Sequence, residues 1–111
     1  MFDIRTQGDV TVVEATDHRI DMETSAAFKA TLDRLIAAGH HRMVLNLKQV
    51  AFMDSAGLGV IMSAFKQLNG QGSLQVCGLQ PRIRTLFDIT RLTRVIGLHE
   101  AEEDAVAAAS H

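Results

Sequence analysis

The feature that most constrains the fold of this chain is an apolar strand that leads into an amphipathic helix near the middle of the sequence. Residues 42–48 form a short, mostly apolar run of strand length, the pattern of a strand that is covered on both faces. Beyond residue 57, apolar residues recur at the spacing i, i+3, i+4, i+7 and i+10, which is one face of a helix. The polar residues in between are therefore predicted to lie at a helix N-terminus. The residues of the apolar face are Leu58, Ile61, Met62, Phe65 and Leu68.

Residue types set the register of this junction. With Asp54 as the N-cap, Met53 and Leu58 occupy the two positions that close a hydrophobic staple. With Ser55 as the cap, the second of those positions would fall on Gly59, which has no side chain. The sequence therefore favours Asp54 as the cap, which makes Ser55 the first helical residue and leaves its hydroxyl free.

Gly57 and Gly59 then fall in the first turns of the helix, where a glycine costs about 1 kcal/mol relative to alanine. A bare backbone at this place lets another surface approach closely. The start of the helix is therefore a candidate binding surface. The simpler alternative is that Asp54 and Ser55 are only two good capping residues.

Length and composition predict a single domain, residues 1–111, because the chain is too short for two cores. Hydrophobic residues make up 47% of it and charged residues 22%, which suits a packed core. A formal charge of −2 gives no basis for binding nucleic acid or an anionic membrane. No signal segment and no long apolar run is seen, so we expect a cytoplasmic protein. The lone Cys77 excludes an intrachain disulfide and is expected to be buried, and the five phenylalanines are predicted to be core residues.

The first part of the chain predicts a hairpin followed by a helix. Residues 2–7 and 10–15 are rich in β-branched residues and flank a Gly-Asp turn. A polar loop, residues 16–21, follows, and Asp21 or Thr24 could cap the next helix. The apolar face of that helix and its glycine stop are Phe28, Leu32, Leu35, Ile36 and Gly39.

The last part of the chain repeats the alternation of strand and helix. A strand at residues 74–77 leads to a helix that begins at Pro81. Val95 and Ile96 are expected to add a short strand, and residues 99–106 a partly frayed helix with acids in its first turn. The predicted buried side of the helix that begins at Pro81 consists of Ile83, Leu86, Phe87 and Ile89.

This order of elements predicts an α/β fold, a mixed β-sheet of four to five strands packed by about four helices. Binding sites in such sheets lie where the loops leave the strand ends. Residues 17–21 are therefore expected at the same rim as Asp54 and Ser55.

Several of these runs resemble a known family. Residues 44–47 followed by 52–61 resemble the signature of the STAS family and, within it, the stand-alone bacterial anti-sigma factor antagonists. Residues 74–81 and 86–92 are similar to the next strand and helix of that family, and Asp21 matches an aspartate of its first loop. The resemblance covers nearly the whole chain and implies a STAS-like fold.

The resemblance also implies a partner switch. In that family the serine after the aspartate is phosphorylated by an anti-sigma factor that is itself an ATP-dependent serine kinase. The unphosphorylated antagonist binds this kinase and releases its sigma factor, and a serine phosphatase reverses the phosphorylation. Carried over to this chain, the phosphorylated residue is Ser55. The predicted partner-binding residues are Asp21, Met53, Asp54, Ser55, Ala56, Gly57, Leu58, Gly59 and Met62.

Two departures from the family pattern bear on the choice of partner. Ala56 stands where the family often has a second serine or threonine, and residues 17–19 replace a glycine-containing pattern in the first loop. The same kind of module also serves in scaffolds and in nucleotide-binding or lipid-binding assemblies, which is the alternative function. We expect a monomer or a weak dimer without a cofactor.

Other chemistries find little support. Ser55 and Asp54 are adjacent at a helix start and point different ways, and Gly-x-Ser-x-Gly is absent, so no enzyme is predicted. His40 and His41 are expected to be solvated loop residues rather than metal ligands, and His111 to be disordered. Four arginines near Pro81 are either a solvated helix face or a site for an anionic nucleotide or acidic partner: Arg82, Arg84, Arg91 and Arg94.

Overall fold

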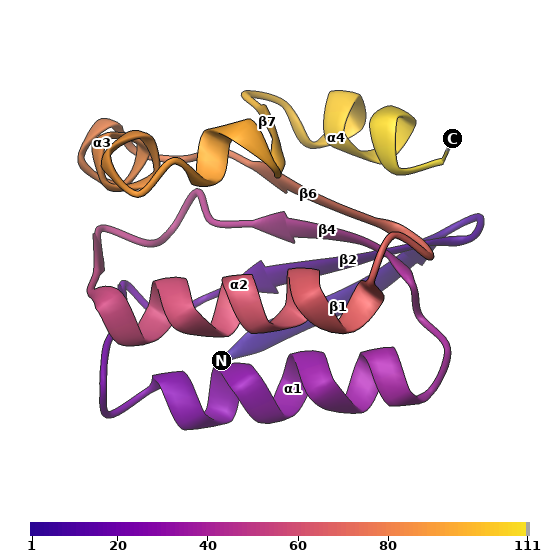
Figure 1. The fold of residues 1–111 in the computed structure, drawn as a ribbon, viewed down its shortest axis with the longest axis horizontal. Helices are drawn as coiled ribbons and strands as arrows, with labels where there is room; N and C mark the ends of the chain where they lie inside the picture. Colours follow the sequence, from indigo (N-terminus) through magenta and orange to yellow (C-terminus); the bar gives the residue numbers. More distant parts are fainter. Residues whose placement is uncertain (111) are drawn as a thin grey trace.

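A five-stranded mixed sheet forms the centre of the computed structural model, which describes residues 1–110 (Figure 1). The strand order is β1-β2-β4-β6-β7, with β1 and β2 antiparallel and the other neighbours parallel. This confirms the predicted hairpin and mixed sheet; His111 lies outside the described residues. The strands are β1 (Phe2–Gln7), β2 (Val10–Ala15), β4 (Arg42–Asn46), β6 (Ser73–Cys77) and β7 (Gly97–His99).

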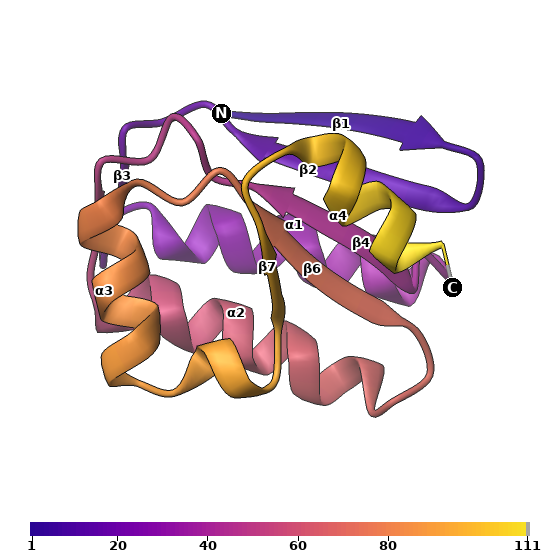
Figure 2. The same cartoon turned by 90° about the horizontal axis from the view of Figure 1, so that it is seen from above.

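Helices cover both faces of the sheet. Helices α1 and α2 lie side by side on one face and α4 lies on the other, as Figures 1 and 2 show. None of the helices in residues 1–110 is long and apolar enough to cross a membrane. The helical elements are α1 (Ser25–Ala37), α2 (Ser55–Leu68), α3 (Pro81–Ile89), the short 3-10 helix η1 (Leu92–Arg94) and α4 (Glu102–Ala109).

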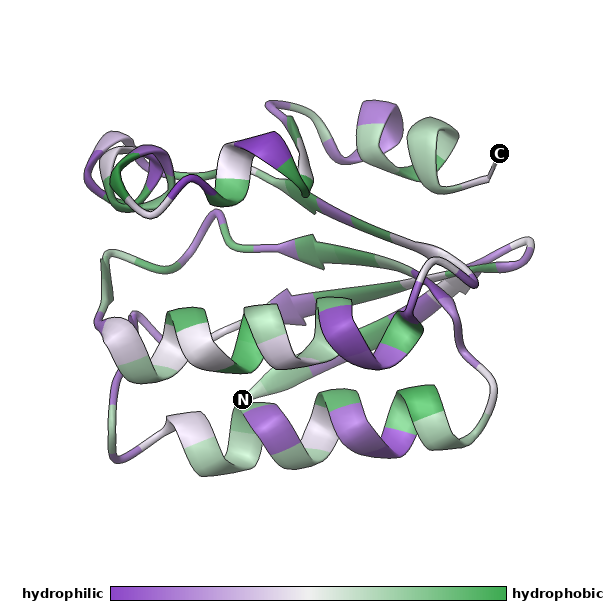
Figure 3. Ribbon diagram, in the orientation of Figure 1, coloured by the Kyte–Doolittle hydropathy of each residue, from purple (hydrophilic) through white to green (hydrophobic). Residues whose placement is uncertain are grey.

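The larger part of the core lies between the sheet and helices α1, α2 and α3, and includes Phe28, Leu45, Ile61 and Phe87. Figure 3 shows the apolar colouring of β4, which is buried on both faces. Full burial of such side chains is worth about 1.5–3 kcal/mol each. A smaller cluster under α4 confirms that Cys77 is buried; its members are Val10, Val12, Val44, Cys77, Ala105 and Ala109.

Helix α1 has the predicted apolar face, with Phe28, Leu32, Leu35 and Ile36 all buried. It ends at the predicted glycine, since Gly39 follows the C-cap with φ +95°. Residues with a side chain do not easily adopt this backbone conformation, whereas glycine does.

Three predictions near the end of the chain are wrong. Ile89 is 72% exposed, because Ile83 and Phe87 set the buried line of α3 and Ile89 lies about 200° around the helix from Phe87. The final strand is not at Val95 and Ile96 but at β7, since η1 occupies the preceding residues and leaves Val95 49% exposed. Because β7 includes His99, the last helix begins at Glu102 rather than at residue 99.

Two very short strands were not predicted. Strand β3 (Arg19–Ile20) pairs in parallel with β5 (Phe52–Met53), apart from the main sheet. This pairing ties the loop before α1 to the start of α2, where the predicted site residues lie.

Candidate functional site

Asp54 caps helix α2, as the register argument predicted. Its backbone is extended, and its carboxylate Oδ1 accepts hydrogen bonds from the N–H groups of Ala56, at 2.9 Å, and Gly57, at 3.4 Å. Met53 and Leu58, at the two staple positions, are 5% and 7% exposed. An N-cap of this kind stabilises a helix by about 1 kcal/mol.

Ser55 is consequently the first residue of α2 and its side chain is exposed. Because Asp54 supplies the cap, the hydroxyl of Ser55 makes no hydrogen bond to any other residue in the described part of the chain. The hydroxyl therefore stands at the solvent-facing mouth of the helix, close to the positive end of its dipole.

The two glycines in the first turns have different surroundings. A Cβ at Gly57 would lie 2.7 Å from Met53 Cγ and 2.9 Å from Ile20 Cγ2. The surface that approaches this bare backbone is thus the chain's own pair of short strands, rather than a second molecule. Gly59 is exposed, and a Cβ there would meet nothing within 4 Å.

The pairing of β3 with β5 brings the first loop beside Asp54. Ile20 pairs with Met53, and the Ile20 carbonyl accepts a hydrogen bond from the Asp54 N–H at 3.3 Å. This places residues 17–21 at the same rim as the start of α2, as expected from the sequence. The one apolar residue of that loop, Ile20, was the available signal for a strand.

Asp21 organises the turn into α1. Its Oδ1 accepts the N–H groups of Glu23, at 3.0 Å, and Thr24, at 3.2 Å, while Thr24 Oγ1 accepts the N–H of Asp21 at 2.9 Å. Thr24 is the N-cap by position but makes no side-chain bond to the helix, and the carboxylate of Asp21 bonds only the turn that precedes Ser25, so the predicted side-chain cap of α1 is not formed by either residue.

Asp21 is held as a carboxylate. Partial desolvation raises its pKa, but the hydrogen bond from Arg19 and the backbone N–H groups of Thr24 and Glu23 outweigh it, so the pKa lies below its ordinary value. Arg19 Nε donates to Asp21 Oδ2 at 3.2 Å. Asp21 is therefore ionised at the rim, where it is paired with Arg19.

Phe52 is not the core residue that the sequence predicted. It is only half-buried, and the guanidinium carbon of Arg19 lies 4.5 Å from the centroid of its ring. This is the geometry of a cation–π contact, worth about 0.5–1 kcal/mol at an exposed site. The contact holds Arg19 over β5 and extends the rim.

Two shallow depressions flank the exposed start of α2. Met22, at the edge of the first depression, is 81% exposed. The first is lined by Arg19, Asp21, Met22, Glu23, Phe52 and Asp54, and the second by Gly59, Met62, Ser63, Lys66 and Gln67.

The predicted partner-binding residues fall into three groups by burial. Ser55 and Gly59 are exposed. Half-buried residues frame them, and buried residues support them from beneath. The half-buried residues are Asp21, Asp54, Ala56 and Met62, and the buried ones are Met53, Gly57 and Leu58.

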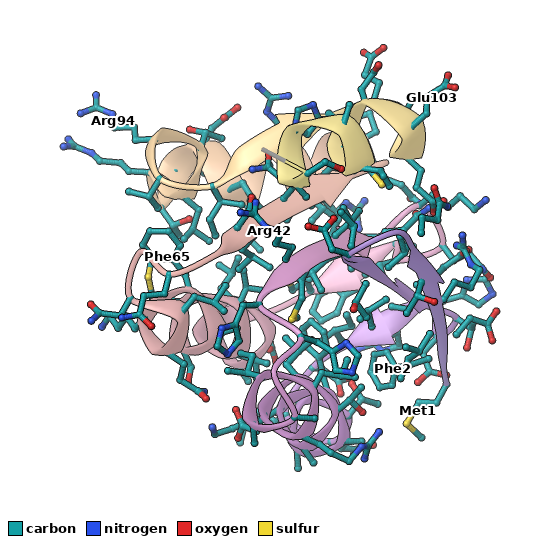
Figure 4. All side chains as sticks on the ribbon, turned by 90° about the vertical axis from the view of Figure 1, so that its right-hand side faces the viewer. Met1, Phe2, Arg42, Phe65, Arg94 and Glu103 are labelled. Atoms are coloured by element: carbon teal, nitrogen blue, oxygen red, sulfur yellow. The ribbon has the colours of Figure 1, made fainter. Side chains whose placement is uncertain are left out.

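Several of the histidines and arginines singled out in the sequence bond to other residues of the chain. Thr11 Oγ1 and His40 Nδ1 share a hydrogen bond at 2.9 Å, and His41 Nε2 donates to the Ile36 carbonyl at 3.3 Å. Within residues 1–110 no three His, Cys, Asp or Glu side chains are grouped so that they could hold a metal ion. Arg84 pairs with Asp88, and Figure 4 shows Arg94 projecting away from the molecule.

Comparison with known proteins yields a consistent picture. A family model described as the STAS domain matches residues 1–105. The chain is 33% identical over 89 residues to the anti-sigma F factor antagonist of Paenibacillus polymyxa, a match that covers 78% of this chain and 76% of that protein.

Solved structures show the same fold. An anti-sigma factor antagonist from Mycobacterium paratuberculosis superposes with a TM-score of 0.92 at 23% identity, over 100% of this chain and 94% of that one. The phosphorylated form of the Bacillus cell fate determinant SpoIIAA gives a TM-score of 0.76 at 20% identity, over 97% of this chain and 98% of that one.

Proposed function

Because this chain belongs to the STAS domain family and its relatives are anti-sigma factor antagonists, which are regulators and not enzymes, we propose that it is a cytoplasmic partner switch controlled by phosphorylation of Ser55. In this proposal the unphosphorylated chain binds an anti-sigma factor that is also a serine kinase and so releases a sigma factor. A serine phosphatase acting on phospho-Ser55 restores binding.

The observation that carries this proposal is the position of Ser55. It is exposed at the first turn of α2, its hydroxyl is not used as a cap, and Asp54 before it and Gly59 after it each line a depression. A kinase must reach a free hydroxyl, and a docking partner needs an accessible surface around it. Both requirements meet at this one place.

The proposed docking surface consists of the exposed and half-buried residues around Ser55. Asp21 and Asp54 supply carboxylates, and Gly59 leaves the backbone of α2 bare beside the second depression. The buried residues Met53, Gly57 and Leu58 act indirectly, because they hold β3, β5 and the first turn of α2 together.

Phosphorylation would change this surface without unfolding the protein. A phosphate adds about −1.5 to −2 charges, and at Ser55 these would stand beside the carboxylate of Asp54. The helix N-terminus can accommodate the added charge, and the fold of this chain resembles that of the phosphorylated form of SpoIIAA. The partner, however, would have to desolvate a dianion. A loss of about 3 kcal/mol would lower affinity roughly a hundredfold.

The test is affinity capture from a lysate of the source cells with wild-type, Ser55→Ala and Ser55→Asp baits. We expect wild type and Ser55→Ala to retain a small ATP-binding serine kinase that Ser55→Asp loses. Ser110 is an exposed serine that lies far from Ser55 in the sequence. Ser110→Asp is therefore the matched control and should behave as wild type.

Thermal unfolding of the same variants separates a switch from a structural defect. Ser55→Asp should leave the melting temperature nearly unchanged.

If all baits retain the same proteins, Ser55 is not the switch. If the kinase's other client is not a sigma factor, the alternative output, a scaffold or a nucleotide-binding or lipid-binding assembly, is favoured.

A further inference from the structure

The outer edge of strand β1 is an open surface for pairing. All its residues after Phe2 are exposed, and Figure 2 shows β1 as the outermost strand of the sheet. Natural edge strands are usually protected by charged side chains, proline, a bulge or a short length. Strand β1 has no proline and pairs with β2 over six residues in an unbroken register, and its only charged residues are Asp3 and Arg5.

The hydrogen bonds to β2 show which backbone groups point outward. The Thr16 N–H donates to the Met1 carbonyl at 2.9 Å, which makes Met1 and Thr16 a hydrogen-bonded pair. Such pairs alternate along an antiparallel ladder. Asp3, Arg5 and Gln7 therefore bond to β2, whereas Phe2, Ile4 and Thr6 direct their N–H and C=O groups away from the sheet.

We propose that β1 pairs antiparallel with β1 of a second copy of this chain, about a two-fold axis at Ile4. Ile4 then lies opposite Ile4 of the second copy, and Phe2 lies opposite Thr6. The outward groups of these residues form about six backbone hydrogen bonds. The result is a continuous ten-stranded sheet, twice the five strands of one copy.

The charges of β1 select both this occupant and this register. In the proposed pairing Asp3 of each copy faces Arg5 of the other, so two opposite-charge pairs form by symmetry. A shift of the partner strand by two residues in one direction would place Asp3 opposite Asp3, and in the other direction Arg5 opposite Arg5. Like charges directly opposite each other destabilise a strand pair. The strand is thus complementary to itself in one register only.

The side chains on both faces suit the pairing. Ile4 is 41% exposed, so its partner would cover apolar surface that is now in water. Phe2 stacks on Phe28 of α1 with the ring centroids 5.5 Å apart, so its side chain is already packed within the chain. Arg5 bonds Glu102, at 2.8 Å, and Glu14, at 3.1 Å, and its guanidinium keeps further N–H donors for Asp3 of a second copy.

The test is the molar mass by sedimentation equilibrium, measured over about 10 µM to 1 mM. We expect the wild-type mass to rise from 12.1 kDa toward twice that value. Ile4→Lys and Ile4→Glu, each alone, should raise the dissociation constant at least tenfold, because like charges meet at the axis. An equimolar mixture of the two should regain the dimer, since lysine then faces glutamate.

Ile89→Lys is the matched control, because Ile89 is an equally apolar exposed residue on α3 and should not alter the mass. Thr6→Pro removes only an outward N–H and should also abolish the dimer without a new charge. A monomeric wild type throughout, or a mixture that stays monomeric although circular dichroism shows folded variants, overturns the proposal.

Discussion

At the scale of single residues, alanine substitutions of the two glycines at the start of α2 should change the stability of the fold in opposite directions. A Cβ at Gly57 would clash with Met53 and Ile20, so Gly57→Ala should destabilise the fold by about 1–3 kcal/mol. Gly59 is open, so Gly59→Ala should raise stability by up to about 1 kcal/mol through helix propensity. Urea unfolding measures both.

The same pair tests the docking surface. If Gly59 lies in the partner interface, Gly59→Ala should weaken binding to the captured kinase while the fold becomes more stable. A more stable variant that binds as well as wild type would place Gly59 outside the interface.

Asp54 gives a second prediction at this scale. Asp54→Ala removes the carboxylate that accepts the N–H groups of Ala56 and Gly57, and should cost about 1 kcal/mol. Asp54→Asn keeps an oxygen acceptor at the cap and should cost only a few tenths of that. The comparison uses urea unfolding at pH 7. Equal stability of all three proteins would mean that the cap contributes nothing.

The sequence predicted the cap but not the reason for Gly57. Asp54, Met53 and Leu58 lie within five residues of one another, so local spacing alone determined the register. The contact between Gly57 and Ile20 joins residues that are far apart in the chain, and no local pattern encodes it. For the same reason the sequence placed Phe52 in the core, where an apolar run suggested burial, although Arg19 covers its ring instead.

At the scale of elements, length decided what could be predicted. Hairpin β1–β2 and helix α2 were predicted with their boundaries, and helix α1 with its apolar face and its end, because each contains enough residues to show a period. Strands β3 and β5 have two residues each and show none, yet their pairing assembles the candidate site. The rim was predicted from the rule that loops meet at strand ends, while the strands that build it were not.

Helix α4 is an element held by contacts that no local pattern reveals. Glu102 accepts two hydrogen bonds from the guanidinium of Arg5, at 2.8 and 2.9 Å, and one from Asn46, at 2.9 Å. Beneath this helix lies Cys77, whose pKa is raised to about 11 by burial and by the nearby charges of Glu102 and Glu14. The thiol should therefore react slowly at neutral pH.

Cys77 can consequently report whether α4 detaches. Glu102→Gln should accelerate alkylation of Cys77 by iodoacetamide, while Glu103→Gln, an exposed neighbour, should not. Arg5→Gln separates detachment from electrostatics, because the charge of Arg5 lowers the pKa of Cys77 and its loss alone would slow the reaction. Faster labelling in Arg5→Gln therefore supports detachment, and slower labelling contradicts it.

At the scale of the whole molecule, carboxylates with lowered pKa values make the stability of the fold depend on pH. Hydrogen bonding to Arg5 lowers the pKa of Glu102 from 4.5 to about 2, against a smaller opposing effect of burial. The pKa of Asp33 is also lowered, because Gln67 on α2 and Lys29 donate to it, and that of Asp21 is lowered at the rim. Glu102 and Asp33 join separate elements of the chain, whereas Asp21 holds a local turn, so acid should loosen several contacts together.

The sign follows from linkage. A carboxylate whose pKa is lower in the folded state stabilises the fold above its unfolded pKa, and this contribution is lost as pH falls through the folded pKa. We therefore expect the urea midpoint to be level near pH 7 and to fall below about pH 4.5. Glu102 should account for about 1–3 kcal/mol of the loss of stability between pH 5 and pH 2. We expect a value near the lower end of this range, because Arg5 is partly solvated and its charge is screened. Glu102→Gln should be less stable than wild type at pH 7, and its urea midpoint should fall less steeply as the pH is lowered. If the midpoint of the variant falls as steeply as that of wild type, other carboxylates govern acid unfolding.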